Sequence, residues 1–234
     1  MKPIIGILEW PYVDGDGEKV YEILSPIIEW VEKCGGKPIG LFPGITGDYV
    51  NKEISELNKK TLLELRELKE LVKMCDGIVK VGANRIYPYE NSIYEFTNKE
   101  DIPYLGICSG MNMMRNYNSE SAPNVLNGDY VLHYLKDGYA HNVTIMPNTK
   151  LSSILGEEEI MVNSRHNYHI PDQGKMEIAA YADDGVIEAL EAKDKLFSIG
   201  VQWHPELLPF TDKNSTNLFG EFIESAKVYK KHKI

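Results

Sequence analysis

One cysteine of this chain lies in a sequence context typical of a nucleophile. Residues 105–112 read LGICSGMN, so an apolar strand runs into the pattern G-x-C-x-G around Cys108, and a helix is expected directly after it. Glycines on both sides allow the sharp strand-to-helix turn of a nucleophile elbow. The sulfur would lie at a helix N-terminus, where partial positive charge favours the thiolate, and the Ser109 N–H would face a developing oxyanion. The alternative is a buried core cysteine beside a tight turn, and a partner base decides between the two.

Among the six histidines, His204 is the best candidate for that base. It occurs in GVQWHPE, directly after a predicted strand, and Glu206 lies two residues further along the chain. Residues two apart in an extended segment point to the same side, so the Glu206 carboxylate can approach the imidazole and fix its orientation. A histidine before proline at a strand end is by itself more typical of a turn. Two strand-end motifs, each with one member of a triad, favour catalysis.

The elements that must position these motifs alternate between strands and helices in the first half of the chain. Apolar runs predict strands over 3–8, 37–43, 77–81 and 103–107. Apolar residues at three- and four-residue spacing predict helices over 19–34 and 61–75. Shorter helices are expected over 91–98, between two strands, and over 111–117, after the cysteine motif. This alternation predicts a parallel sheet covered by helices on both faces, with functional groups at the carboxyl ends of its strands.

The second half of the chain has a different pattern. Short segments joined by tight polar turns predict an antiparallel meander over 141–147, 159–164, 176–182, 185–191 and 196–203, and a final helix is expected over 215–230. No linker or internal repeat divides the sequence. The expected fold is therefore one α/β domain over residues 1–234, a three-layer, flavodoxin-like and mostly parallel sheet that ends in the antiparallel meander.

Composition limits the classes of partner. The chain has 234 residues, with 25 Lys plus Arg against 35 Asp plus Glu, and the net charge of −10 disfavours nucleic acid or an anionic membrane. The N-terminus lacks a signal-peptide pattern, and no apolar stretch approaches the roughly 20 residues that span a bilayer. Cys34 and Cys75 are expected to pack in the core. An odd cysteine count without a C-x-x-C motif fits a reducing, cytoplasmic compartment.

Four motifs in this order, LGICSGM, NSRHNYH, DDGVIEALE and GVQWHPE, resemble the class I glutamine amidotransferase-like superfamily, and within it most closely the gamma-glutamyl-gamma-aminobutyrate hydrolase branch. The resemblance covers nearly the whole chain. It implies a Cys108 nucleophile, a His204 general base and acid, Glu206 as the orienting carboxylate, and no cofactor.

Two departures from the family pattern concern the site. Residues 81–84 read VGAN where the family usually has a Pro-Gly-Gly turn that supplies the second oxyanion N–H. Ala83 or Gly82 is expected to supply that amide, although alanine does not readily adopt the positive φ of glycine. Asn112 replaces the usual glutamine, and a substrate-anchoring role for its shorter amide is a hypothesis.

The resemblance implies hydrolysis of the γ-amide bond of a γ-glutamyl compound through a glutamyl thioester. The NSRHNYH segment offers Ser164, Arg165 and His166 for the glutamyl group, at a strand end where the family places part of its pocket, and Arg85 is a second candidate cation. His166 and His169 lie three residues apart, but no Cys or carboxylate joins them at metal-site spacing, so we expect no metal site.

Two other classes of function stay open at this point. One is a glutaminase subunit that passes ammonia to a separate synthetase partner, and the other is a catalytically silent binding module. The sequence identifies neither the leaving amine nor whether two copies form a homodimer.

Overall fold

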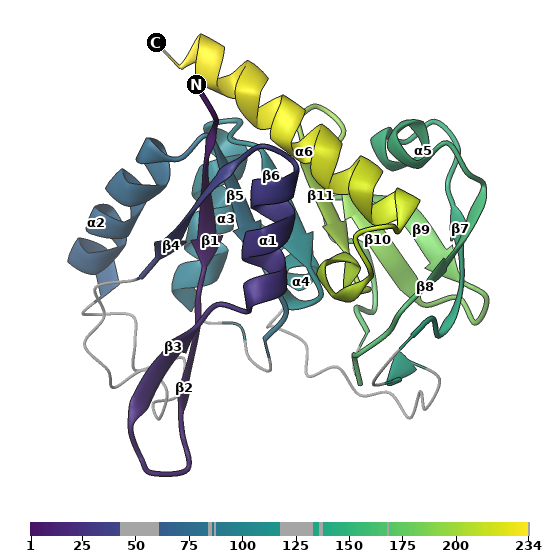
Figure 1. The fold of residues 1–234 in the computed structure, drawn as a ribbon, viewed down its shortest axis with the longest axis horizontal. Helices are drawn as coiled ribbons and strands as arrows, with labels where there is room; N and C mark the ends of the chain where they lie inside the picture. The colour runs from purple at the N-terminus through teal and green to yellow at the C-terminus, as the bar shows by residue number, and fades with distance from the viewer. Residues whose placement is uncertain are drawn as a thin grey trace.

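The computed structural model describes residues 1–42, 61–83, 86, 88–117, 133–135, 138–167 and 169–233. A nine-stranded sheet forms the centre of the molecule, in the order β4-β1-β5-β6-β11-β10-β9-β7-β8 (Figure 1). Its strands are β1 (Ile4–Leu8), β4 (Lys37–Leu41), β5 (Gly77–Lys80), β6 (Tyr104–Ile107), β7 (His141–Ile145), β8 (Glu159–Val162), β9 (Glu177–Ala182), β10 (Ile187–Glu191) and β11 (Ser198–Val201).

Helices cover both faces of this sheet. They are α1 (Ser25–Lys33), α2 (Thr61–Met74), α3 (Pro88–Lys99), α4 (Ser109–Arg115), α5 (Lys150–Leu155) and α6 (Lys213–His232). Successive side chains of the buried strands point to opposite faces of the sheet and pack into two hydrophobic cores, one on each face. Ile7 and Val79 pack with α1 and α6, whereas Ile78 packs with α2, α3 and α4. The predicted three-layer α/β fold is confirmed.

The two halves of the sheet meet at β11. This last strand is parallel to β6 and antiparallel to β10. Strands β4, β1, β5, β6 and β11 are parallel to their neighbours in that series, and β10, β9, β7 and β8 are antiparallel to theirs. Because β9 pairs with β7 instead of β8, the second half is not a simple meander, and β8 lies at the edge.

The register of the central strands brings three loops to one edge of the sheet. In the parallel ladder, Lys80 of β5 lies opposite Gly106, and Ile107 of β6 lies opposite Val201 of β11. The segments that follow these strands therefore emerge side by side. They carry residues 81–83 of the altered turn, the G-x-C-x-G motif and the HPE motif.

The helix expected over 19–34 is wrong in its first part. Residues Lys19–Glu22 form β3, which pairs antiparallel with β2 (Trp10–Val13), and the helix begins at Ser25. The Asp14 side chain accepts the backbone N–H groups of Asp16 and Glu18 and so closes the hairpin turn. Pro26 fixes the helix start because proline is tolerated only in the first turn. None of the described helices has the length and apolar character needed to cross a bilayer.

Candidate active site

The segment around Cys108 forms the strained elbow that its glycines predict. Cys108 has φ 53° and ψ −106°, a rarely occupied backbone region for a non-glycine residue, and α4 starts at the next residue. A Cβ on Gly106 would lie 2.6 Å from the Gly110 carbonyl oxygen, and one on Gly110 would clash with the Lys80 carbonyl oxygen. Only glycine fits at both positions, so the chain can turn sharply and α4 can pack close to the sheet.

The end of β11 places His204 and Glu206 beside this elbow. The Cys108 N–H donates to the Val201 carbonyl at 2.7 Å, which ties the elbow to β11. His204 Nδ1 lies 2.7 Å from Glu206 Oε1, and both side chains are buried. A Cβ built on Gly82 would lie 2.8 Å from His204 Cε1 and 3.4 Å from Cys108 Sγ, so the imidazole and the sulfur converge on the same point.

Asn163 holds the backbone of the histidine in place, and sequence reasoning missed it. Its Nδ2 donates to the His204 carbonyl at 2.8 Å, and its Oδ1 accepts the His204 N–H at 3.0 Å. This pair of hydrogen bonds fixes the peptide that carries the imidazole. The signal was present, because Asn163 opens the NSRHNYH motif, but only the next three residues were considered as ligands for a substrate.

The environment of His204 favours its protonated form. Burial alone would lower the pKa of the imidazole, but the charge of Glu206 and the nearby Cys108 sulfur raise it to about 10. The imidazole is therefore a cation near neutral pH. A cationic imidazole beside a cysteine can stabilise a thiolate nucleophile and can later donate its proton to a leaving group.

The predicted second oxyanion donor needs correction. The Ala83 N–H donates to Ser109 Oγ at 2.9 Å, and that hydroxyl also lies 3.3 Å from the Val81 carbonyl oxygen. The Ala83 N–H is thus used in a hydrogen bond that joins the turn after β5 to the elbow. Gly82, whose position adjoins both Cys108 and His204, is left as the better candidate for the second amide beside that of Ser109.

The predicted glutamyl-binding residues separate into different places. Ser164 Oγ donates to the His133 carbonyl at 2.6 Å, and His166 Nε2 faces Glu188 Oε1 at 3.4 Å, so neither is placed for a glutamyl carboxylate. Arg165 is half-buried, and its backbone pairs with that of Tyr134 in an isolated antiparallel β-bridge.

Asn112 lies on α4, and its buried Oδ1 has no hydrogen-bond partner among the described residues. This oxygen is therefore a buried acceptor whose hydrogen-bonding capacity is unused among the described residues. Arg85 lies outside the described residues.

Several known proteins are similar to this chain in sequence. The model of the Peptidase C26 family matches residues 3–206. "Putative glutamine amidotransferase PB2B2.05" of Schizosaccharomyces pombe is 29% identical, over 88% of this chain and 83% of that protein. The CTP synthase of Chlamydia caviae is also 29% identical, over 70% of this chain but only 36% of the synthase.

A solved structure of similar shape confirms the fold. The glutaminase domain of the Trypanosoma brucei CTP synthase, with bound acivicin, superposes with a TM-score of 0.68 at 17% identity, over 97% of this chain and 94% of that one. The family model covers most of the sequence, from the first strand to the glutamate beside the candidate histidine. This chain therefore belongs to the Peptidase C26 family, with a glutamine amidotransferase-like α/β fold.

Proposed function

We propose that this chain hydrolyses the γ-amide bond of a γ-glutamyl compound, with Cys108 as nucleophile. The observation that carries the proposal is the convergence of a strained cysteine elbow with a histidine whose Nδ1 lies 2.7 Å from a buried glutamate. Nucleophile, base and orienting carboxylate are the three roles that acyl transfer through a covalent intermediate requires. The family description and the amidotransferase relatives point to amide bonds as the target.

The reaction balances with groups of this chain and one water molecule. The Cys108 thiolate adds to the γ-carbonyl carbon, and the amides of Ser109 and Gly82 donate hydrogen bonds to the oxyanion. The oxyanion collapses and the C–N bond breaks, while the His204 imidazolium gives its proton to the departing amine. His204 then takes a proton from water as the hydroxide adds to the thioester. Collapse of this second intermediate releases glutamate and restores the thiolate.

Asn112 is the proposed contact for the glutamyl group, since its Oδ1, which accepts no hydrogen bond among the described residues, lies on the helix that follows the nucleophile. Arg165 stays a candidate for the α-carboxylate. A glutamyl pocket predicts that Asn112→Ala raises KM more than it lowers kcat, because the lost contact is present in both the ground state and the transition state.

The experiment compares Cys108→Ala and Cys108→Ser with the wild type on glutamine and on a panel of larger γ-glutamyl amines, with glutamate release as the readout. We expect both variants to lose turnover while they keep the wild-type melting temperature. Intact-protein mass spectrometry of a quenched reaction should show the glutamyl adduct on the wild type alone. Cys34→Ala is the matched control, because Cys34 is half-buried at the end of α1 and packs against the core. Full turnover by Cys108→Ala would refute the assignment.

A second candidate function is that of a glutaminase that supplies ammonia to a synthetase partner. It is favoured by the similarity to CTP synthases, of which this chain spans about a third. The same substrate panel separates the two functions. Turnover confined to glutamine, and stimulated by a separate synthetase, would support the glutaminase, whereas efficient cleavage of larger γ-glutamyl amines by the isolated chain would support the hydrolase.

A further inference from the structure

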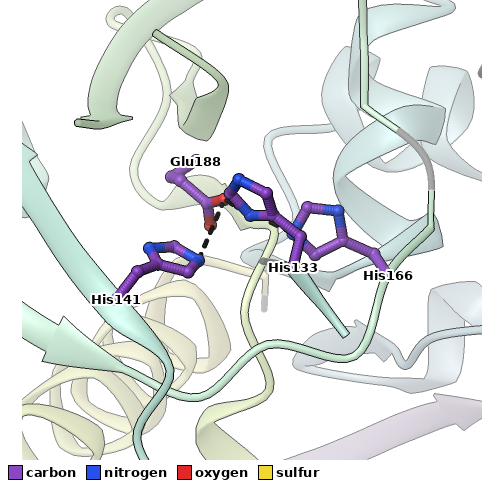
Figure 2. A group of neighbouring side chains, drawn as sticks. All are labelled: His133, His141, His166 and Glu188. Atoms are coloured by element: carbon purple, nitrogen blue, oxygen red, sulfur yellow. Dashed lines mark ion pairs between the residues drawn. The ribbon is translucent and has the colours of Figure 1, made fainter. Parts of the chain in front are cut away.

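Away from the Cys108 elbow, four side chains from separate segments meet inside the antiparallel half of the molecule. His141 begins β7, Glu188 lies on β10, His166 follows β8, and His133 lies in a short turn between α4 and β7. Figure 2 shows the three imidazoles arranged around the carboxylate. Glu188 Oε1 lies 3.3 Å from His133 Nδ1, 3.4 Å from His166 Nε2 and 3.7 Å from His141 Nε2. One carboxylate oxygen therefore faces three ring nitrogens.

The carboxylate at the centre of this cluster is buried, and the three imidazoles face it at ion-pair distance. Glu188 is 0% exposed, and neither of its oxygens has a hydrogen bond of standard geometry among the described residues. His141 Nε2 is also buried and has no hydrogen bond of standard geometry among the described residues. A buried charge without a hydrogen-bonding or metal partner is costly. A cation between the carboxylate and the imidazoles would satisfy these atoms together.

The outer nitrogens of two imidazoles are already held in the way that metal-binding histidines are held. His141 Nδ1 lies 3.1 Å from the Asn142 carbonyl oxygen, and His133 Nε2 lies 3.0 Å from Asp184 Oδ2. Metal-binding histidines usually donate their second N–H to a carbonyl or a carboxylate, which fixes the tautomer. Here the tautomers so fixed leave a lone pair on His141 Nε2 and on His133 Nδ1. Both of these nitrogens face Glu188, as does His166 Nε2.

We propose that His133, His141, His166 and Glu188 bind one zinc ion. The four candidate ligand atoms all lie within 4.8 Å of one another. Tetrahedral zinc with bonds of about 2.0–2.1 Å places neighbouring ligand atoms about 3.3–3.4 Å apart, which is close to the three distances around Glu188 Oε1. Three imidazoles and one carboxylate form a nitrogen-rich donor set that suits zinc better than magnesium or calcium. Four protein ligands close the coordination sphere, as in a structural zinc site.

The position of the site gives the ion a structural role beside the catalytic histidine. His166 is three residues from Asn163, whose amide brackets the His204 backbone. The His166 N–H also donates to the His133 carbonyl at 2.9 Å. An ion bound to both imidazoles, to β7 and to β10 would fasten the segment over 163–166 to the sheet. Zinc would therefore stabilise the fold and help to hold Asn163 against the His204 backbone without contacting the reacting atoms.

The experiment measures zinc content and zinc-dependent stability, so it does not depend on the proposed hydrolase activity. The full chain is purified without a histidine tag, and its metal content is determined by plasma mass spectrometry. We expect one equivalent of zinc per chain. Removal of the ion with a chelator should lower the melting temperature, and added zinc chloride should restore it, because a ligand that binds only the folded state stabilises that state.

Two variants and one control locate the ion. Glu188→Gln keeps the size of the side chain and removes its charge, and His141→Ala removes one imidazole. Both should lose most of the bound zinc and the zinc-dependent rise in melting temperature. His232→Ala, at the exposed end of α6, should keep both.

Cobalt provides a second measurement on the wild type, in case a variant fails to fold. Cobalt added to the metal-free chain should give the intense visible bands of a tetrahedral site. Absence of stoichiometric zinc together with no zinc-dependent change in melting temperature would overturn the proposal, as would wild-type zinc content in Glu188→Gln.

Discussion

Glu206→Gln tests the electrostatics of the proposed triad most directly. In the wild type, the Glu206 carboxylate and the Cys108 sulfur outweigh burial and raise the pKa of His204 from 6.5 to about 10. That difference corresponds to about 5 kcal/mol in favour of the imidazolium. Glutamine keeps the shape of the side chain and a hydrogen-bonding oxygen, but it removes the negative charge 2.7 Å from Nδ1.

The variant should lower the pKa of His204 by about one to three pH units, the usual effect of one opposite charge at close range. Burial is unchanged in the variant and also lowers the pKa of His204, because it opposes the charged imidazole. His204 should therefore titrate between about pH 7 and 9 in the variant, while it stays protonated over this range in the wild type. If the proposed reaction is correct, kcat should fall by about three to four orders of magnitude, as for other triads that lose their carboxylate.

The assay is a pH titration of the chain labelled with 13C-histidine, followed by the Cε1–H resonances. Comparison with His204→Gln assigns the signal, and His232, exposed at the end of α6, supplies an internal reference. Cys108→Ser in the Glu206→Gln background separates the contribution of the sulfur from that of the carboxylate. A His204 resonance that titrates at the same pH in the wild type and in Glu206→Gln would show that the Glu206 charge does not hold the imidazole protonated, and would refute the proposed triad electrostatics.

Three further substitutions test the surroundings of the site. Gly82→Ala should lower kcat by roughly 100-fold with little change in melting temperature, because its Cβ would lie 2.8 Å from His204 Cε1 and displace the imidazole. Lys80→Met should destabilise the fold by about 3–5 kcal/mol in urea unfolding, because it leaves the buried Glu90 carboxylate without its cation. Burial raises the pKa of Glu9 to about 7, so the stability that the protonated carboxyl contributes is lost as the pH rises from about 4.5 through 7. Glu9→Gln should remove this dependence and stabilise the protein by up to about 3 kcal/mol above pH 7, with no gain at pH 4.

The part of the site that lies at the ends of parallel strands could be predicted from sequence. Cys108 directly follows the short apolar strand β6, and His204 comes three residues after the end of β11. Parallel strands of one sheet present their carboxyl ends at one edge. Local patterns were therefore sufficient to place two distant motifs together. The glycines around Cys108 added a backbone requirement, the sharp turn, that the structure shows as a positive φ.

The sequence was less informative where pairing depends on long-range register. The expected helix over 19–34 was wrong in its first part because Val20 and Tyr21 belong to a hairpin. Apolar spacing alone does not distinguish the two structures, and Pro26, which lies in the first turn of α1, was not used as a helix-start signal. Ala83 was expected to face the oxyanion, but the Ser109 hydroxyl accepts its N–H. Such a bond depends on how the turn after β5 packs against the elbow, which no local motif specifies.

The histidine cluster was missed for a related reason. His166 was considered with His169, its neighbour at i, i+3, whereas its partners come from three other segments, and Glu188 lies in a strand whose five residues are all buried. Antiparallel pairing of β7 with β9 and of β9 with β10 brings those segments together, and this strand order does not follow the order of the chain.

The segment over 163–166 connects the cluster to the elbow. Asn163 at its start forms two hydrogen bonds with the His204 backbone, and His166 at its end faces Glu188. A change at the cluster should therefore reach catalysis through the position of His204 and not through the charge on its imidazole, which Glu206 and Cys108 determine. Loss of zinc should accordingly reduce kcat while the pH at which His204 titrates stays near its wild-type value, the opposite of what Glu206→Gln should do.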